Sequence, residues 1–301
     1  MSLEDNIRMI VEQVLKEMSS SKSKAEDYKQ AVEQASKEPA SSCDEDAPLS
    51  DLAEIDIQKQ LLVPNPKNRE FYMRMKEATP ARIGVWRCGT RPLTETLLRF
   101  RADHAIAQDA VMGEVSSDFA ERYGMVFTKT KCRDKDEFLT RPDLGRRLDE
   151  ESLETIRKKC EKGAQVQIIV ADGLSSKAVE ANVPDLLPAL KQGLERLGVK
   201  KIGTPIFVKY GRVAVMDVIG EELKPECAVV LIGERPGLGT AESLSAYMGY
   251  NPRIGMLESE RMVVSNIHRR GGVPPAEAGA HLATLIKKIL DAKASGVNLK
   301  L

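Results

Sequence analysis

The sequence predicts an α/β protein. A C-terminal domain built on a Rossmann-like, mainly parallel sheet is preceded by a helical N-terminal domain and a flexible leader with an amphipathic helix. From about residue 150, short β-branched runs alternate with helical segments, which is typical of parallel sheets that helices cover on both faces. Before that point, apolar residues recur mostly at helical spacing. The 301 residues suffice for about two domains with a sizeable core.

The leader is predicted to contain an amphipathic targeting helix over residues 1–20 and a flexible linker over residues 21–50. In the helix, the apolar residues share one stripe: Leu3, Ile7, Ile10, Val11, Val14, Leu15 and Met18. The linker is rich in Ser, Ala, Glu and Lys. An isolated helix of about 15 residues is marginal in water, so its apolar stripe serves a partner or packs against the body of the chain.

Residues 51–130 are predicted to form a helical domain. Leu93, Leu97 and Phe100 recur at helical spacing and mark one helix, and a shorter helix is expected over residues 70–75. Arginines in this region are interleaved with aromatic residues: Arg82, Arg87, Arg91, Arg99 and Arg101 with Trp86 and Phe100. Such a group suits nucleic acid, but in the absence of a recognition motif a solvated or subunit-facing surface is the favoured interpretation.

Residues 131–301 are predicted to form the Rossmann-like domain. Strands are expected over residues 165–171, 205–210 and 227–232, a strand or loop over 263–268, and helices over 151–161, 176–197 and 274–294. Finer expectations concern four places: an irregular charged connection over residues 131–137, a helix break at Pro184, an extended stretch over residues 212–218, and a further helix beginning near Ala241.

Charge and cysteine content exclude several classes of protein. The 45 basic and 45 acidic side chains give no net charge, although residues 1–60 carry 14 acids against 7 bases, and the rest of the chain balances this −7. A general nucleic-acid binder or a polybasic membrane protein would need net positive charge. The chain has no long apolar run, no signal peptide and no C-x-x-C pair among its five cysteines. We therefore expect a cytoplasmic protein without a metal site and without a nucleic-acid or membrane partner.

Two loops that follow predicted strands are candidates for ligand binding, because ligands of doubly wound sheets lie beyond the carboxyl ends of the strands. They span residues 172–176 and 233–239. The glycines of the second loop do not have the spacing of a dinucleotide fingerprint. This loop is therefore either a tight turn without a ligand or a loop whose backbone closely approaches another kind of ligand. In the second case, Ser243 or Ser245 would lie near a helix N-terminus, and Glu234 could accept hydrogen bonds from a large polar ligand.

The sequence contains no recognisable catalytic constellation. Asp103 and His104 are adjacent on a predicted helix and point about 100° apart, so they cannot form an orienting pair. His281 falls in the C-terminal helix, which leaves His268, in a loop beside Arg269, as the functional candidate. Since no nucleophile, base and orienter converge, we assign no catalytic residue and do not expect a stand-alone hydrolase.

Seven blocks occur in order between about residue 80 and residue 300. They are ARIGVWRCGTRP (81–92), LLRFRADH (97–104), LTRPDLGRRL (139–148), DGLS (172–175), YGRV (210–213), GERPGLG (233–239) and SNIH (265–268). Together they resemble the small (light) subunit of ethanolamine ammonia-lyase.

This resemblance implies a subunit of an enzyme that uses adenosylcobalamin to convert ethanolamine to acetaldehyde and ammonia by radical rearrangement. The large subunit, a TIM barrel, would hold the substrate and the catalytic side chains. The small subunit would contribute cobalamin binding and assembly and would not be active alone. The cofactor would lie between the subunits, in an assembly of six large and six small chains.

Carried over by motif, the cobalamin contacts fall at Val213, at Glu234 and at Val264, which directly precedes Ser265. The family pattern has Cys at the last position, so a backbone contact would survive here and a sulfur contact would be lost. The Asp-x-His-x-x-Gly signature, whose His displaces the cofactor's own base from cobalt, is absent. The resemblance therefore implies base-on binding.

The leader resembles the encapsulation peptides of bacterial microcompartments, which implies a location inside such a compartment and shell proteins as partners. Two other functions belong to different classes. One is a non-catalytic scaffold or adaptor of a metabolic complex that uses the leader and the arginine-bearing surface. The other is a nucleotide-binding Rossmann enzyme, which the glycine spacing disfavours.

Overall fold

The computed structural model describes residues 51–300 with the exception of residue 53. The chain divides into two units after Asp51, and all elements described below belong to the second. The predicted targeting helix over residues 1–20 and the linker over residues 21–50 lie outside the described residues. None of the helices in the described part of the chain is long and apolar enough to cross a membrane.

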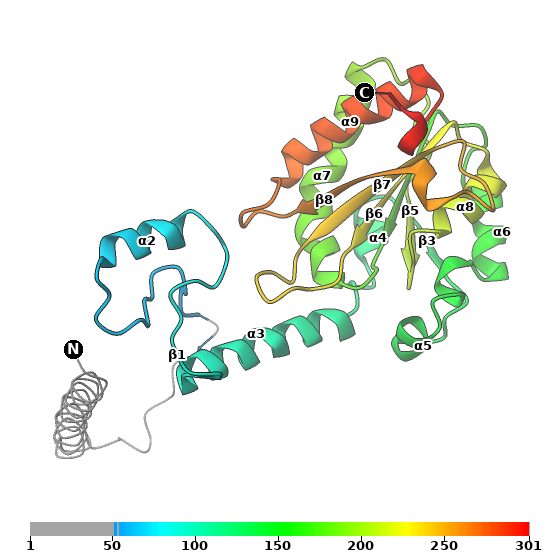
Figure 1. Cartoon of the computed structure of the whole chain (residues 1–301). Coiled ribbons are helices and arrows are strands. Elements are labelled where there is room, and N and C mark those ends of the chain that lie inside the picture. Colours follow the sequence, from blue (N-terminus) through cyan, green and yellow to red (C-terminus); the bar gives the residue numbers. More distant parts are fainter. Residues whose placement is uncertain (1–50, 53, 301) are drawn as a thin grey trace, which may run out of the picture. The chain divides into compact units, whose positions relative to one another are not determined.

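A six-stranded sheet in the order β3-β5-β4-β6-β7-β8 forms the centre of this unit (Figure 1). The strands are β3 (Val126–Lys129), β4 (Val166–Ala171), β5 (Ile206–Lys209), β6 (Cys227–Gly233), β7 (Leu244–Tyr250) and β8 (Arg261–Ile267). The first four in spatial order are parallel, and β7 and β8 continue the sheet in antiparallel fashion. The predicted α/β class with a mainly parallel sheet is confirmed.

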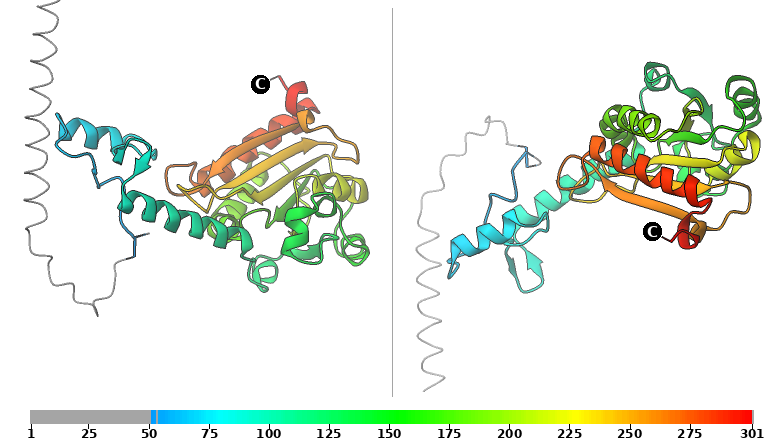
Figure 2. Two further views of the ribbon diagram at one scale, coloured as in Figure 1. Left: turned by 60° about the horizontal axis from the view of Figure 1, so that its bottom comes forward. Right: turned by 90° about the horizontal axis from the view of Figure 1, so that it is seen from above.

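Helices cover both faces of the parallel strands (Figure 2). They are α6 (Glu150–Lys159), α7 (Ser176–Arg196), α8 (Val215–Leu223) and α9 (Pro275–Ala292). Helices α7 and α9 form the first core with one face, through residues such as Leu190 and Ile286. Helices α6 and α8 form the second core with the other face, through residues such as Ile156 and Ile219. Strands β4 and β6 are consequently buried along their whole length.

Helix α7 is continuous through Pro184 and Pro188, so the predicted break at Pro184 is wrong. Each proline removes one backbone hydrogen bond, but the helix buries Leu186 and Leu190 completely. It packs so closely on α9 that a Cβ atom on Gly279 would lie 2.7 Å from the Leu186 carbonyl oxygen. Burial along this face outweighs the hydrogen bonds that the prolines remove.

The stretch over residues 212–218 is not extended as predicted, because α8 begins at Val215. Its apolar run buries Val215, Met216 and Ile219 on one side of a helix against the sheet. A run of this length fits a buried strand and a buried helix equally well, so periodicity alone did not separate the two.

The helix predicted from near Ala241 is also wrong, because this part of the chain forms strand β7. Strand β7 pairs with β6 over its full length and is buried or half-buried on both faces, which hides the alternation that identifies a strand. Ser243 therefore precedes a strand and Ser245 lies within it, and neither stands at a helix N-terminus.

Strand β3 lies within the segment predicted as helical, and its parallel pairing with β5 makes it an edge strand of the sheet. The connection over residues 131–137, predicted as irregular, contains the start of helix α5 (Lys135–Thr140). The Asp134 carboxylate caps this helix by accepting a hydrogen bond from the Glu137 amide at 2.8 Å. The short 3₁₀ helix η1 (Leu144–Arg146) follows it.

The part of the unit before the sheet is helical, with one small hairpin. Its elements are α2 (Arg69–Glu77), β1 (Arg87–Cys88), β2 (Arg91–Pro92), α3 (Thr94–Met112) and α4 (Phe119–Arg122). The two helices predicted here are present as α2 and α3, whereas the hairpin was not predicted. Buried Asp103 of α3 pairs with Arg82 and Arg99, so two of the five clustered arginines hold the fold together.

Candidate functional site at the carboxyl edge of the sheet

The loops singled out in the sequence meet at one edge of the sheet. Strands β4, β5 and β6 are parallel, so the segments that follow them, beginning at Asp172, Tyr210 and Glu234, leave from the same edge. Strand β7 begins and β8 ends there too, since Gly233 pairs with Leu244 and Leu244 pairs with Ile267. Ligands of doubly wound sheets bind at this edge.

Asp172 ties two of these loops together. Its fully buried carboxylate accepts hydrogen bonds from the amides of Gly173 at 2.8 Å and Gly211 at 3.2 Å. Burial raises the pKa of this carboxyl, and the nearby Lys135 ammonium opposes the rise. The glycines serve close packing of loop on loop, because a Cβ atom on Gly233 would lie 2.0 Å from the Ser175 carbonyl oxygen.

Helix α5 and η1 cover the loop ends of β4 and β5. The Lys135 ammonium lies over the Phe138 ring and donates a 3.3 Å hydrogen bond to the Gly173 carbonyl. The Arg212 guanidinium donates to the Phe138 carbonyl at 2.7 Å, and the Arg212 amide donates to the Gly145 carbonyl at 2.8 Å. The loop that carries Val213 is therefore held from both sides.

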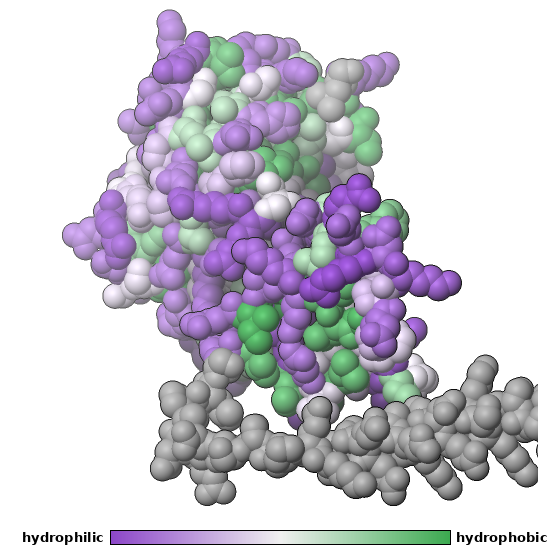
Figure 3. All heavy atoms as spheres, turned by 90° about the vertical axis from the view of Figure 1, so that its left-hand side faces the viewer, coloured by the Kyte–Doolittle hydropathy of each residue, from purple (hydrophilic) through white to green (hydrophobic). Residues whose placement is uncertain are grey.

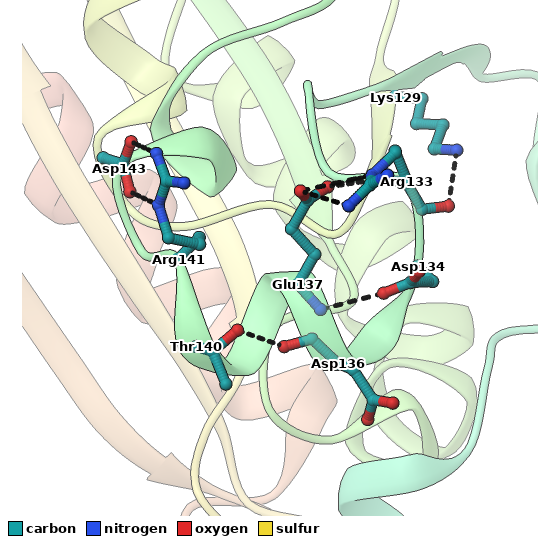
Figure 4. Close-up of polar contacts among 8 residues, drawn as sticks. All are labelled: Lys129, Arg133, Asp134, Asp136, Glu137, Thr140, Arg141 and Asp143. Atoms are coloured by element: carbon teal, nitrogen blue, oxygen red, sulfur yellow. Dashed lines mark hydrogen bonds and ion pairs between the residues drawn. The ribbon is translucent and has the colours of Figure 1, made fainter.

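Figure 4 shows how this covering segment is braced by contacts of its own. Glu137 accepts hydrogen bonds from the amide and the guanidinium of Arg133, and Arg141 forms a bidentate pair with Asp143 at 3.0 and 2.9 Å. These polar contacts are largely exposed and add little stability by themselves. Their effect is to fix the conformation of the motif LTRPDLGRRL.

Glu234 and Val213 lie on the same face of the sheet. The Glu234 carboxylate accepts a 3.0 Å hydrogen bond from the Tyr247 hydroxyl of β7. Burial, together with the Glu234 charge, raises the pKa of Tyr247 to about 12, so this hydroxyl remains a donor at neutral pH. Val213 and Tyr247 both pack against the second core.

Beyond α8, the same face continues over β7 and β8 without a covering helix (Figure 2). Val263 is directly opposite Tyr247 in the register and is 53% exposed. At its far end the face is closed by Arg261, which pairs with Asp217 of α8 at 2.8 and 2.9 Å. The uncovered part presents an apolar platform with a carboxylate and a phenol at its rim. We call this surface, with Val213, Glu234, Tyr247 and Val263, the β7–β8 platform.

Val264 is near this platform along the chain, but its side chain lies on the opposite face of β8. It packs against the first core, below α7 and α9. Val213 and, through its bond to Tyr247, Glu234 thus lie on the face of the second core, whereas the Val264 side chain lies on the other face. Tyr247 was missed by sequence reasoning because it fell in a stretch predicted to be helical.

His268 follows β8 and is buried. Its Nδ1 accepts a hydrogen bond from the Arg270 amide at 3.2 Å, so Nε2 carries the proton and donates it to the Asn266 side-chain oxygen at 2.8 Å. Burial lowers the pKa of the imidazole. With both nitrogens engaged, His268 maintains the shape of this loop and is not poised as a base.

A cavity of about 290 Å³ lies at the same edge beside strand β3, and Asp172 lines it together with residues that include Glu114, Phe127 and Lys209. Glu114 is already paired there, because it accepts hydrogen bonds from Lys209 at 2.8 Å and from Tyr210. Within residues 51–300, no group of three or more His, Cys, Asp or Glu side chains is arranged to hold a metal ion.

Comparison with known proteins agrees with the blocks identified in the sequence. The family model described as "Ethanolamine ammonia-lyase light chain (EutC)" matches residues 69–300. The chain is 53% identical to the ethanolamine ammonia-lyase small subunit of Clostridium tetani over 298 residues. It is 50% identical to those of Clostridium perfringens over 300 residues and Listeria monocytogenes over 297 residues. Each alignment covers 99% of both chains.

Proposed function

Because the chain belongs to the ethanolamine ammonia-lyase small-subunit family, we propose that it is the subunit that receives adenosylcobalamin and helps to assemble this lyase. The large subunit carries the substrate, ethanolamine, and the chemistry that yields acetaldehyde and ammonia, so the small chain is not active alone. The cofactor supplies the radical when bound. The residues of this chain bind and position it.

The β7–β8 platform is the single observation that carries this proposal. A corrin is a broad ring with an apolar face and a rim of amide side chains. The half-exposed Val263 and the partly buried Val213 offer an apolar surface to such a ring. The Glu234 carboxylate, held by Tyr247, offers an acceptor to the amide N–H groups at its rim. An apolar surface with a carboxylate acceptor suits a large, amide-bearing ligand better than a dinucleotide, whose phosphates carry negative charge.

Base-on binding agrees with the state of the histidines. His268 uses both ring nitrogens within its own loop, and His104 and His281 lie on helices α3 and α9, neither of which is part of the β7–β8 platform. No histidine of this chain is therefore offered as a cobalt ligand, and the cofactor keeps its own base. We place the cofactor at the interface with the large subunit, because the platform is open on the side that α8 leaves uncovered.

The test is cobalamin binding by the complex of this chain with its large subunit. We expect Glu234→Ala to raise the Kd for cobalamin by about tenfold, the loss of a charge-assisted hydrogen bond, while the two subunits still copurify. Glu277→Ala, which removes an exposed carboxylate of α9, is the matched control. An unchanged Kd in Glu234→Ala would remove this residue from the site, and activity of the small chain alone would overturn the division of roles.

In the same assay, Val264→Cys separates the two ways in which position 264 can contact the cofactor. The side chain packs against the first core, so we place the contact at the backbone and expect the Kd to change by less than about twofold. A several-fold tighter Kd would show that the sulfur of Cys makes the contact.

The same proposal covers where the complex is located in the cell and how many subunits it contains. Residues 1–20, with one apolar stripe, would direct the cytoplasmic complex of six large and six small chains into a bacterial microcompartment by binding shell proteins. Deletion of residues 1–20 should abolish co-localisation with the shell and leave lyase activity intact. If co-localisation persists, the leader is not the targeting signal.

The alternative function, a non-catalytic scaffold, requires that the complex bind cobalamin equally well without this chain.

A further inference from the structure

Exposed apolar side chains are concentrated in one part of the molecule. Among the described residues, eight of the fifteen exposed large hydrophobic side chains lie between residues 71 and 112. Figure 3 views the molecule from the left-hand side of Figure 1, where this part of the chain lies, and shows hydrophobic patches between hydrophilic side chains. Apolar patches of this kind, rimmed by polar residues, mark interaction surfaces.

Helix α3 contributes most of them, because Leu97, Leu98, Phe100, Ile106 and Met112 are all exposed. Its buried side consists of Asp103, Ala107 and Ala110, and Asp103 is paired there with Arg82 and Arg99. At 100° per residue, Leu97, Leu98 and Met112 fall on the opposite side of the helix. They are 40%, 45% and 57% exposed. We call them the outer stripe.

A surface helix of a self-contained domain normally has one apolar stripe and a polar opposite face. Exposed leucine and methionine side chains opposite the buried side of α3 therefore indicate that a partner covers that side. Near the N-terminal end of α3, in the loop before the hairpin, Trp86 is 41% exposed, and its carbonyl accepts a hydrogen bond from the Leu93 amide at 3.2 Å. Trp86 adds an aromatic side chain of the type that dominates interface energetics.

Charge around the outer stripe indicates what covers it. Arg87, Arg91 and Arg101 are exposed and form no ion pair within residues 51–300. An apolar surface bordered by unpaired guanidinium groups fits a partner surface that combines apolar residues with carboxylates. Because the chain belongs to a family of small subunits, a large protein partner is already required.

We infer that the outer stripe of α3, with Trp86 and the arginines of the hairpin, is the surface on which the large subunit docks. This inference takes the identity of the partner from the proposed function, but it does not depend on where cobalamin binds. The β7–β8 platform and the outer stripe are formed by different elements. Substitutions can therefore disrupt the outer stripe and leave the β7–β8 platform intact, or the reverse.

The test is copurification of the tagged, full-length small chain with its coexpressed large subunit. We expect the double variant Leu97→Asp, Leu98→Asp to retain at least about 30-fold less large subunit, the factor typical of a hot spot. Arg101→Glu should weaken retention in the same direction. The matched control is Ile254→Asp, Leu257→Asp, which places the same charges on side chains that are 67% and 65% exposed in the loop between β7 and β8. The control should copurify as the wild type does.

A photo-cross-linking residue in place of Leu98, in an otherwise unchanged chain, covers the case in which the double variant does not fold. Cross-links to the large subunit support the inference. Cross-links to residues 1–50 of the same chain, or to a second small chain, overturn it, as does normal copurification of a folded double variant. Loss of cobalamin binding in Glu234→Ala with normal copurification leaves the docking surface unaffected, so the two proposals fail independently.

Discussion

At the scale of single residues, the candidate site depends on side chains that hold one another. Glu234 follows a buried strand, but its carboxylate is oriented by Tyr247 from the neighbouring strand. Val213 is held in place because the adjacent Arg212 donates hydrogen bonds to carbonyl groups of α5 and η1. Of the residues that support these two family positions, Arg212 and Gly145 belong to the motifs, whereas Tyr247 and Phe138 do not.

Tyr247→Phe tests this support directly. The variant keeps the aromatic ring and removes only the hydroxyl that donates to Glu234. We therefore expect the free energy of cobalamin binding to weaken by about 1 kcal/mol, which is a roughly fivefold rise in Kd. Tyr250→Phe is the matched control, because this tyrosine of the same strand packs against the first core. If both variants bind cobalamin equally, Tyr247 does not position Glu234.

His268 makes the stability of the fold depend on pH. Burial lowers its pKa in the folded state below the ordinary value of 6.5, and the Glu242 charge opposes this only partly. The unfolded state therefore takes up protons first, and the free energy of unfolding falls as the pH drops below about 6.5. Denaturant titrations from pH 7.5 to pH 5 measure this slope. In His268→Gln the slope should be smaller in this window, and an identical slope would contradict the assignment.

At the scale of elements, tertiary packing overrides local preference. Helix α7 contains Pro184 and Pro188 and still runs without interruption from Ser176 to Arg196, because α9 and the sheet cover one side of it. Strand β7 forms from a stretch without clear alternation because β6 and β8 pair with both of its edges. In each case, the partner element supplies what the local sequence lacks.

Pro188→Ala tests how much stability α7 loses because Pro188 cannot donate a backbone hydrogen bond. Residue 188 is exposed, so the substitution restores a backbone donor to the Pro184 carbonyl and disturbs little packing. We expect the free energy of unfolding to increase by about 1–3 kcal/mol. Chemical denaturation measures the change, with Lys177→Ala in the first turn of the same helix as a control that should shift it by less than about 0.5 kcal/mol. A destabilised Pro188→Ala would show that the proline ring itself is needed.

At the scale of the whole molecule, the helical part before the sheet and the loop after β6 are linked by one side chain. The Arg82 guanidinium pairs with Asp103 of α3 and donates a 2.9 Å hydrogen bond to the Leu238 carbonyl. Leu238 lies in the loop that begins with Glu234. This side chain therefore links the buried side of α3, opposite the outer stripe, to the loop that carries Glu234.

Arg82→Ala should loosen that loop. Loss of the bond to Leu238 removes about 1 kcal/mol of local stability, so we expect several-fold faster amide hydrogen exchange over residues 235–241. Mass spectrometry of the isolated chain measures it. Arg87→Ala is the control, because Arg87 is exposed and has no ion pair in the described part of the chain. Equal exchange in the two variants would show that Arg82 does not restrain the loop.

Much of the fold was predictable from local patterns, and the errors share one physical cause. The strongly apolar runs at β4, β5 and β6 and the long periodic helices α7 and α9 were placed correctly. Strand β3 has four residues, and β7 and α8 are short apolar stretches that fit more than one structure. The motifs indicated Val213 and Glu234 as candidates, which remain a prediction, but the contacts of Tyr247 and Lys135 were not predictable, because they are made with residues distant in the chain.

The sequence by itself determined the α/β class, the mainly parallel sheet and membership of the small-subunit family, because repeated apolar runs and ordered motifs are properties of the chain read in one dimension. Only the tertiary structure decided that β7 and β8 extend the sheet in antiparallel fashion, that Val264 faces the opposite side from Glu234, and that α3 exposes Leu97, Leu98 and Met112. The face to which a side chain points depends on register and on what packs above it, and both are set by contacts between distant segments.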